Sequence, residues 1–110
     1  MKLSWKALSA VALALTLTTA GVMAQQRVFF GIATGGTGGT YYPLGGMLAQ
    51  LISNKATVDG KKVSATAESA GASVANAKLL GNNEIESAFV AADILDAAYN
   101  GRAQFDKAPI

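Results

Sequence analysis

The chain has 110 residues, a net charge of +2, 51% hydrophobic residues and 15% charged residues. This length suits one small domain and is too short for two ordinary ones, and the composition excludes an intrinsically disordered chain. The sequence contains no cysteine and no histidine. Disulfides, thiolate metal sites, cysteine nucleophiles and a Ser-His-Asp triad within the chain are therefore excluded.

Residues 1–24 have the features of a secretory signal peptide. Lys2 and Lys6 give a basic start, residues 7–17 form an apolar core, and the segment ends on Val-Met-Ala, with small residues at the cleavage site. The apolar core is shorter than the roughly 20 residues of a membrane-spanning helix. We therefore predict cleavage before Gln25 and export to the periplasm, with no insertion of the mature chain into the membrane.

Removal of this segment changes the charge of the chain. Lys2 and Lys6 are two of the nine basic residues, so the remainder has seven basic and seven acidic residues. A neutral balance gives no electrostatic reason to expect a nucleic acid or an anionic membrane surface as partner. The sequence has no twin arginine and no cysteine for lipid attachment, which favours a soluble product of the general export route.

The remainder is predicted to form three strand-then-helix units, the pattern of an α/β fold with a mostly parallel sheet. The first strand spans residues 28–33, which are rich in β-branched and aromatic residues. The following helix begins near Pro43, which suits a first helical turn because its missing N–H costs nothing there, and it closes at residues 53–55. Apolar side chains at helical spacing form one stripe along this helix: Leu44, Met47, Leu48, Leu51 and Ile52.

The second unit follows a predicted turn at Asp59-Gly60. Residues 62–68 alternate apolar and polar positions, which predicts a short strand. The next helix is predicted from Ser73 to Gly81, with Ser73 as its N-cap and Gly81 as its stop.

The third unit is shorter. Residues 86–90 predict a strand, and residues 91–99 predict a helix that ends at Asn100-Gly101. Residues 102–110 are predicted to form a loop.

Each loop that follows a predicted strand leads into a helix N-terminus: residues 34–42, 69–73 and 91–93. In open parallel sheets, ligands bind outside the carboxyl ends of the strands. Helix N-termini carry free N–H groups and a partial positive charge, so a carboxylate or a phosphate is the favoured ligand. The glycine-rich run TGGTGGTYYP at residues 34–43 is the most distinctive of these loops.

Nucleotide-binding motifs are incomplete in this run. A phosphate-binding P-loop requires GxxxxGK[ST], but no lysine or arginine lies between Arg27 and Lys55. The dinucleotide pattern GxGxxG, started at Gly36, meets Tyr41 where the third glycine should stand. The run therefore predicts an anion site built on backbone and hydroxyl donors.

Catalytic and metal-binding patterns are also incomplete. Residues 71–75, GASVA, are one residue short of the GxSxG nucleophile elbow, with Ser73 in the nucleophile position. The acidic residues are scattered, and Glu84 and Glu86 are the only close pair. We expect no enzyme activity, no metal and no cofactor; a fragment of a secreted serine hydrolase that uses Ser73 is the alternative.

A family resemblance accompanies this pattern. Residues 30–46, FGIATGGTGGTYYPLGG, resemble the N-terminal motif of the TAXI family, the extracytoplasmic solute receptors of tripartite ATP-independent periplasmic (TRAP) transporters. Three later stretches resemble the family's next elements in the same order: SAGASVAN at 69–76, ESAFVAAD at 86–93 and AYNG at 98–101. The resemblance covers about residues 28–106.

The resemblance implies a two-lobed periplasmic-binding-protein fold of the type II-like class. It also implies capture of a small carboxylate, a glutamate-like amino acid or organic acid, for delivery to the TRAP membrane permease subunits. The family often has glutamine where this chain has Ala91. Carried onto this sequence, the ligand contacts are Gly36, Thr37, Gly38, Gly39, Thr40, Tyr41, Ser73, Asn76 and Asp93.

The chain departs from the family in length, because family members are several-fold longer. We expect residues 25–110 to be the N-terminal, incomplete part of the first lobe. Such a chain is either a fragment of a longer gene or a truncated product without function of its own.

Overall fold

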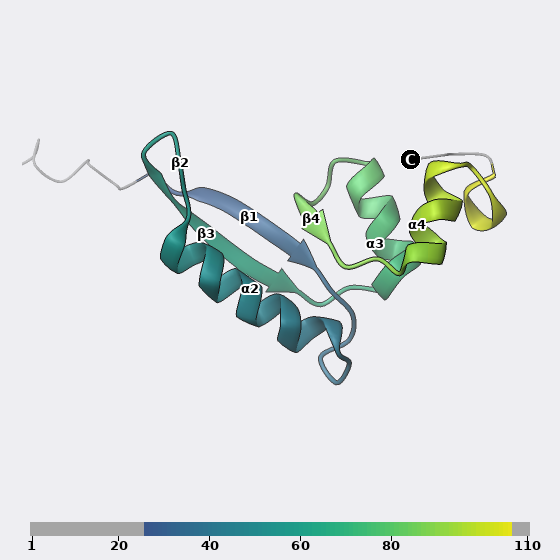
Figure 1. Ribbon diagram of the computed structural model, residues 1–110, viewed down its shortest axis with the longest axis horizontal. Helices are drawn as coiled ribbons and strands as arrows, with labels where there is room; N and C mark the ends of the chain where they lie inside the picture. The colour runs from purple at the N-terminus through teal and green to yellow at the C-terminus, as the bar shows by residue number, and fades with distance from the viewer. Residues whose placement is uncertain (1–25, 107–110) are drawn as a thin grey trace, which may run out of the picture.

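The computed structural model describes residues 26–106 (Figure 1). The predicted signal peptide, residues 1–24, lies outside the described residues and stays a prediction. None of the helices within the described part is long and apolar enough to cross a membrane. The elements run in the order β1 (Val28–Ala33), α2 (Tyr41–Lys55), β2 (Thr57–Val58), β3 (Lys61–Glu68), α3 (Ala72–Gly81), β4 (Ser87–Ala88), α4 (Ala92–Tyr99) and the 3-10 helix η1 (Ala103–Phe105).

Four strands form one sheet in the order β2-β3-β1-β4. β1 is parallel to both of its neighbours, with a register against β3 that runs from Val28↔Val63 to Ala33↔Glu68. β2 is antiparallel to β3. The predicted α/β class with a mostly parallel sheet is therefore confirmed. Because β3, β1 and β4 run in the same direction, their carboxyl ends and the loops that follow meet at one edge of the sheet.

The hairpin between β2 and β3 forms where the turn was predicted. Asp59 and Gly60 have φ angles of 50° and 75°, the left-handed pair that a two-residue hairpin turn requires. The pattern missed β2, which has only two residues, and placed the start of β3 at Lys62 instead of Lys61. A strand of two residues leaves no alternation that a sequence could display.

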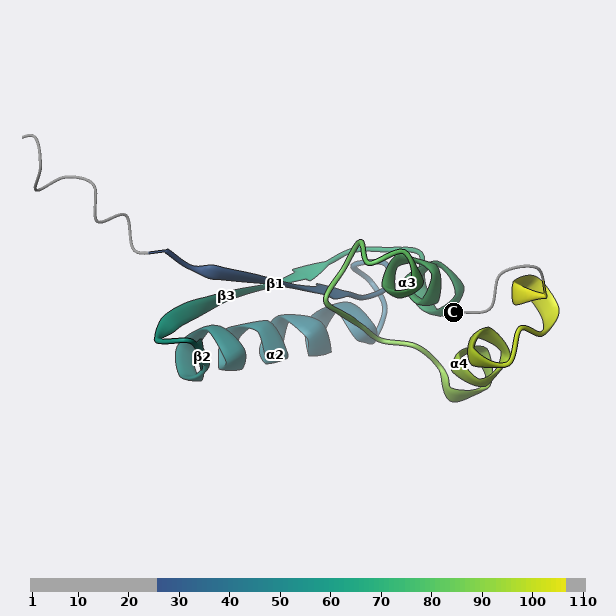
Figure 2. The same ribbon diagram turned by 90° about the horizontal axis from the view of Figure 1, so that it is seen from above.

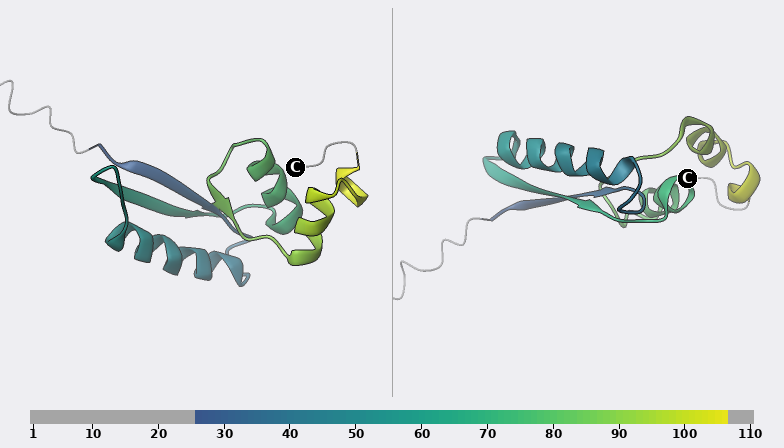
Figure 3. Two further views of the ribbon diagram at one scale, coloured as in Figure 1. Left: turned by 45° about the horizontal axis from the view of Figure 1, so that its top comes forward. Right: turned by 90° about the horizontal axis from the view of Figure 1, so that it is seen from below.

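α2 lies along one face of β1 and β3 (Figures 2 and 3). The residues that it buries are small, Gly45 and Ala49. The apolar stripe, which in an amphipathic helix normally faces the core, is largely exposed here: Leu44 39%, Met47 60%, Leu48 43% and Leu51 56%. The buried face is offset from the stripe by one residue, about 100° around the helix. Small residues allow a closer approach of the helix to the sheet than the leucines would.

An apolar cluster joins α3, α4 and η1, which lie beyond the carboxyl ends of β1 and β3 (Figure 1). At its centre Ala77, Ala98 and Phe105 are each 2% exposed. The prediction of a loop from residue 102 onward is wrong for η1, because the Phe105 side chain needs a fixed backbone turn to reach this core. A surface ion pair between Arg102 and Asp96 lies at the same bend.

Several element boundaries differ from the prediction by one or two residues. α3 begins at Ala72 rather than Ser73, and α4 begins at Ala92 rather than residue 91. β4 is limited to two of the five predicted residues. Gly81 is the last residue of α3, and the left-handed residue that follows is Asn83, with φ 57°. Asparagine is one of the few residues besides glycine that adopts this conformation readily.

The two adjacent glycines of α2 should respond oppositely to alanine. A Cβ on Gly45 would lie 2.5 Å from Cγ2 of the buried Thr34, so Gly45→Ala should lower the free energy of unfolding by about 1–3 kcal/mol. A Cβ on Gly46 meets nothing within 4 Å, so Gly46→Ala should raise it by about 0.5–1 kcal/mol. Urea unfolding of both variants measures the difference; equal effects would show that α2 does not pack as described.

Candidate functional site

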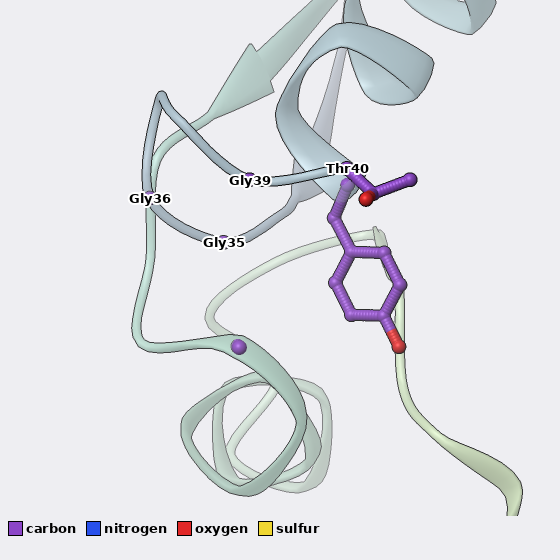
Figure 4. A pocket seen from close by; sticks show the side chains of 6 residues that line it. Gly35, Gly36, Gly39 and Thr40 are labelled. Atoms are coloured by element: carbon purple, nitrogen blue, oxygen red, sulfur yellow. The ribbon is translucent and has the colours of Figure 1, made fainter.

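A hollow of about 310 Å³ lies where the loops after β1 and β3 leave the sheet. Figure 4 shows Gly35, Gly36 and Gly39 on the loop that curls over the hollow, and Thr40 where this loop enters α2. The lining residues are Gly35, Gly36, Gly39, Thr40, Tyr41 and Ala72. None of them is charged, so any polar recognition in the hollow uses backbone groups and hydroxyls.

The glycine-rich loop closes on itself and leaves several N–H groups free. The Gly39 N–H donates to the Gly36 carbonyl at 2.9 Å, which forms a tight turn. The N–H groups of Gly35, Gly36 and Tyr41 donate to no residue among 26–106. Thr40 is the N-cap of α2, but its side chain makes no capping hydrogen bond. The first turn of α2 therefore keeps donors that a bound anion can accept from.

The start of α3 also forms a wall of the hollow. The N-cap of this helix is Gly71, and no side chain caps it. Ala72 has φ 60°, a left-handed conformation that costs a residue with a Cβ about 1–2 kcal/mol. Backbone strain of this kind is concentrated at binding sites, where the surrounding contacts hold it in place. Two helix N-termini thus border the same hollow, one from each loop.

The third loop contributes through an aromatic contact. The ring of Tyr41 stacks on the ring of Phe89, which follows β4, with 5.2 Å between centroids and 20° between planes. Phe89 also donates its backbone N–H to the Ala33 carbonyl at 3.0 Å. The position of the Tyr41 wall therefore depends on the loop after β4.

The structure brings four of the nine predicted contact residues to the hollow: Gly36, Gly39, Thr40 and Tyr41. Thr37 and Gly38 are exposed at the tip of the turn and do not line it. Asp93 is exposed in the first turn of α4 and does not line it either. Two lining residues were missed, Gly35 and Ala72. Their signal was present in the sequence, since both lie in the loops that were predicted to meet.

Ser73 is engaged in holding the third loop. Its Oγ accepts the N–H of Ala91 at 2.9 Å, and it makes no N-cap hydrogen bond to its own helix. The predicted capping role of Ser73 is therefore wrong. The left-handed residue in this turn is Ala72 and not Ser73, whereas a nucleophile elbow places the strained conformation at the serine itself. The hydrolase alternative gains no support from this geometry.

Asn76 is completely buried, at 0% exposure, so its side chain does not face the hollow. Its Nδ2 group donates to the carbonyl oxygens of Ala33 at 3.3 Å, Thr34 at 2.9 Å and Phe89 at 2.8 Å. The prediction that Asn76 contacts a ligand is corrected on this point. The residue was singled out by its place in the second loop motif, but it turns inward because three strand-end carbonyls need a donor.

An open α/β layer whose strand-end loops surround a small hollow is an arrangement in which proteins bind small solutes. Comparison with known families gives the same class, since residues 32–110 match the NMT1-like family. The match covers most of the chain, and the chain belongs to the NMT1-like family, a periplasmic-binding-protein-like family of solute-binding proteins. The predicted fold class and a general solute-binding function are confirmed at this level.

Ser73 provides a test of the site's framework. Ser73→Ala leaves the Ala91 N–H without its acceptor and should lower the free energy of unfolding by about 1–2 kcal/mol. The matched control is Ser64→Ala, because Ser64 is half-buried on β3 and its hydroxyl bonds to no residue among 26–106; its effect should stay within about 0.5 kcal/mol. A fluorophosphonate probe should not label the wild-type protein. Labelling that disappears in Ser73→Ala would support a hydrolase instead.

Proposed function

We propose that this protein is an extracytoplasmic receptor of the TAXI type. It captures a small carboxylate, a glutamate-like amino acid or an organic acid, in the hollow between the loops after β1 and β3. It then presents this ligand to the membrane permease subunits of a TRAP transporter.

The observation that carries the proposal is a set of N–H groups around the hollow that have no hydrogen-bond partner among residues 26–106. Gly35, Gly36 and Tyr41 supply donors from the first loop, and the uncapped start of α3 supplies the partial positive charge of a second helix N-terminus. A carboxylate oxygen accepts several such hydrogen bonds at once, and bonds to a charged acceptor are stronger than bonds between neutral groups. Thr40 and Tyr41, which carry hydroxyl groups, also line the hollow.

The charge of the hollow favours a carboxylate over a phosphate compound. No lysine or arginine among residues 26–106 lines it, so the second charge of a phosphate would find no counterion there. A receptor without a fixed cation also releases its ligand more easily, as delivery to a permease requires.

The transporter assignment has two supports. Membership in a periplasmic-binding-protein-like family provides the general class. The motif in residues 30–46 and its three ordered companions resemble the TAXI receptors in particular, and these serve TRAP permeases. Export by the signal-peptide-like residues 1–24 would bring the protein to the periplasm, where such receptors act.

Small carboxylates should stabilise the folded protein. A ligand at 100 times its dissociation constant adds about 2.7 kcal/mol to the free energy of unfolding, which raises the melting temperature by several degrees. Thermal-shift measurements with millimolar glutamate, succinate and related acids should show this rise, and the uncharged succinamide should not. A cooperatively folded protein that responds to none of the acids would contradict the proposal.

Gly35→Ala should block the hollow without disturbing the fold. The added Cβ would lie 3.7 Å from Cβ of Ala72 and 4.0 Å from Cδ2 of Tyr41. It therefore fits between Ala72 and Tyr41 and fills the space of the ligand. We expect a stability change within about 0.5 kcal/mol and an affinity for the active carboxylate at least about tenfold lower, which corresponds to about 1.4 kcal/mol.

The matched control for this substitution is Gly38→Ala. Gly38 lies in the same loop, does not line the hollow and has open space around its Cα. Isothermal titration of both variants should separate them clearly. Equal affinities for the two variants would mean that the ligand binds elsewhere.

A further inference from the structure

Asn76 connects all three strand-end loops through one side-chain amide. Asn76 itself belongs to α3, after the loop that follows β3. Its Nδ2 group donates to Ala33 and Thr34 at the end of β1 and to Phe89 after β4. The two shortest of these bonds, 2.9 Å to Thr34 and 2.8 Å to Phe89, join two loops that leave the sheet from neighbouring strands.

Burial of the Asn76 side chain costs free energy, and this cost indicates which of its two polar groups the fold requires. Oδ1 of Asn76 is buried and accepts no hydrogen bond from the part of the chain that the structure describes. A buried polar atom without a partner costs about 1–3 kcal/mol, and asparagine is also a poor residue for a helix interior. An apolar residue would avoid both costs. The NH₂ group is the part that the surrounding carbonyl oxygens require.

Both bonded loops lead directly to walls of the hollow. Thr34 precedes Gly35, which lines it, and Phe89 holds the ring of Tyr41, which forms the opposite wall. Thr34 is fixed a second time, because its N–H and its Oγ both donate to the Glu68 carbonyl, at 2.9 Å and 2.7 Å. Movement of the Asn76 amide would therefore shift the two walls relative to each other.

We propose that Asn76 is a positioning residue of the binding site. It does not touch the ligand; it sets the separation between the Gly35 wall and the Tyr41 wall by bonding the backbone behind each of them. The part of this inference that concerns affinity rests on the proposed function. The part that concerns the walls can be tested without any ligand.

The test is fluorine NMR of the full chain with 3-fluorotyrosine in place of tyrosine, with the three signals assigned by Tyr→Phe variants. The Phe89 ring lies against Tyr41, so the Tyr41 signal is displaced by its ring current, and Phe89→Leu defines the position without that effect. Asn76→Leu removes the NH₂ group at similar side-chain volume. We expect its Tyr41 signal to move toward the Phe89→Leu position, while the signal of the exposed Tyr99 stays in place.

Two control variants separate positioning from general loss of stability. Asn82→Leu removes an exposed side chain whose one partner among residues 26–106 is Glu84, and it should leave the Tyr41 signal unchanged. Val63→Ala weakens the core at the opposite end of β1 and β3, so it should lower the urea midpoint without moving Tyr41 or changing the affinity. With glutamate or succinate as the probe, Asn76→Leu should bind at least about tenfold more weakly than Val63→Ala.

The outcomes are distinguishable. A folded Asn76→Leu protein with an unmoved Tyr41 signal overturns the positioning role, even where the carboxylate still binds. A moved signal in a protein that binds no carboxylate supports the positioning role and contradicts the proposed function. If Asn76→Leu does not fold, hydrogen exchange of the wild-type protein decides: the Asn76 side-chain amide should exchange far more slowly than that of Asn82, and equal rates overturn the inference.

Discussion

The structure depends on how the buried end of β1 satisfies its polar groups. Thr34 and Asn76 are both 0% exposed, so the polar groups of these two residues cannot bond to bulk water. Backbone groups buried away from water need partners inside the protein. Thr34 donates twice to Glu68, and Asn76 donates to the strand-end carbonyls on both sides. Gly45 is required at this point because a Cβ there would collide with Thr34.

These buried hydrogen bonds, together with those between neighbouring loops, explain why backbone N–H donors remain beside the hollow. The carbonyl of Gly35 accepts the hydroxyl of Ser69, and the hydroxyl of Ser73 accepts the N–H of Ala91, so side chains of one loop fix the backbone of the next. With the carbonyl oxygens turned to these partners, the N–H groups of Gly35, Gly36 and Tyr41 have no partner within the described part of the chain. The hydrogen bonds that complete the fold thus leave N–H donors beside a hollow that no charged residue among 26–106 lines.

Residue pattern predicted the parts of this architecture that depend on local chemistry. The bounds of β1, the Asp59-Gly60 turn and the place where the loops meet follow from short-range preferences and from the parallel order of the strands. The face of α2 could not be predicted this way, because the close approach at Gly45 outweighs the periodicity of its leucines. The inward turn of Asn76 also depends on the strand ends on either side, which are 42 and 13 residues away in sequence.

A hollow lined by glycine and alanine backbone binds through shape more than through side-chain identity. Among the described residues that line it, only Thr40 and Tyr41 have a polar side chain, so most of its hydrogen-bond donors are peptide groups whose directions the fold fixes. We expect selectivity in such a site to depend on the spacing of the walls, so that a displacement of one loop changes it. In the proposed receptor, the glycine run at residues 34–43 supplies backbone donors, and the buried Asn76 amide behind it fixes the backbone at the end of β1.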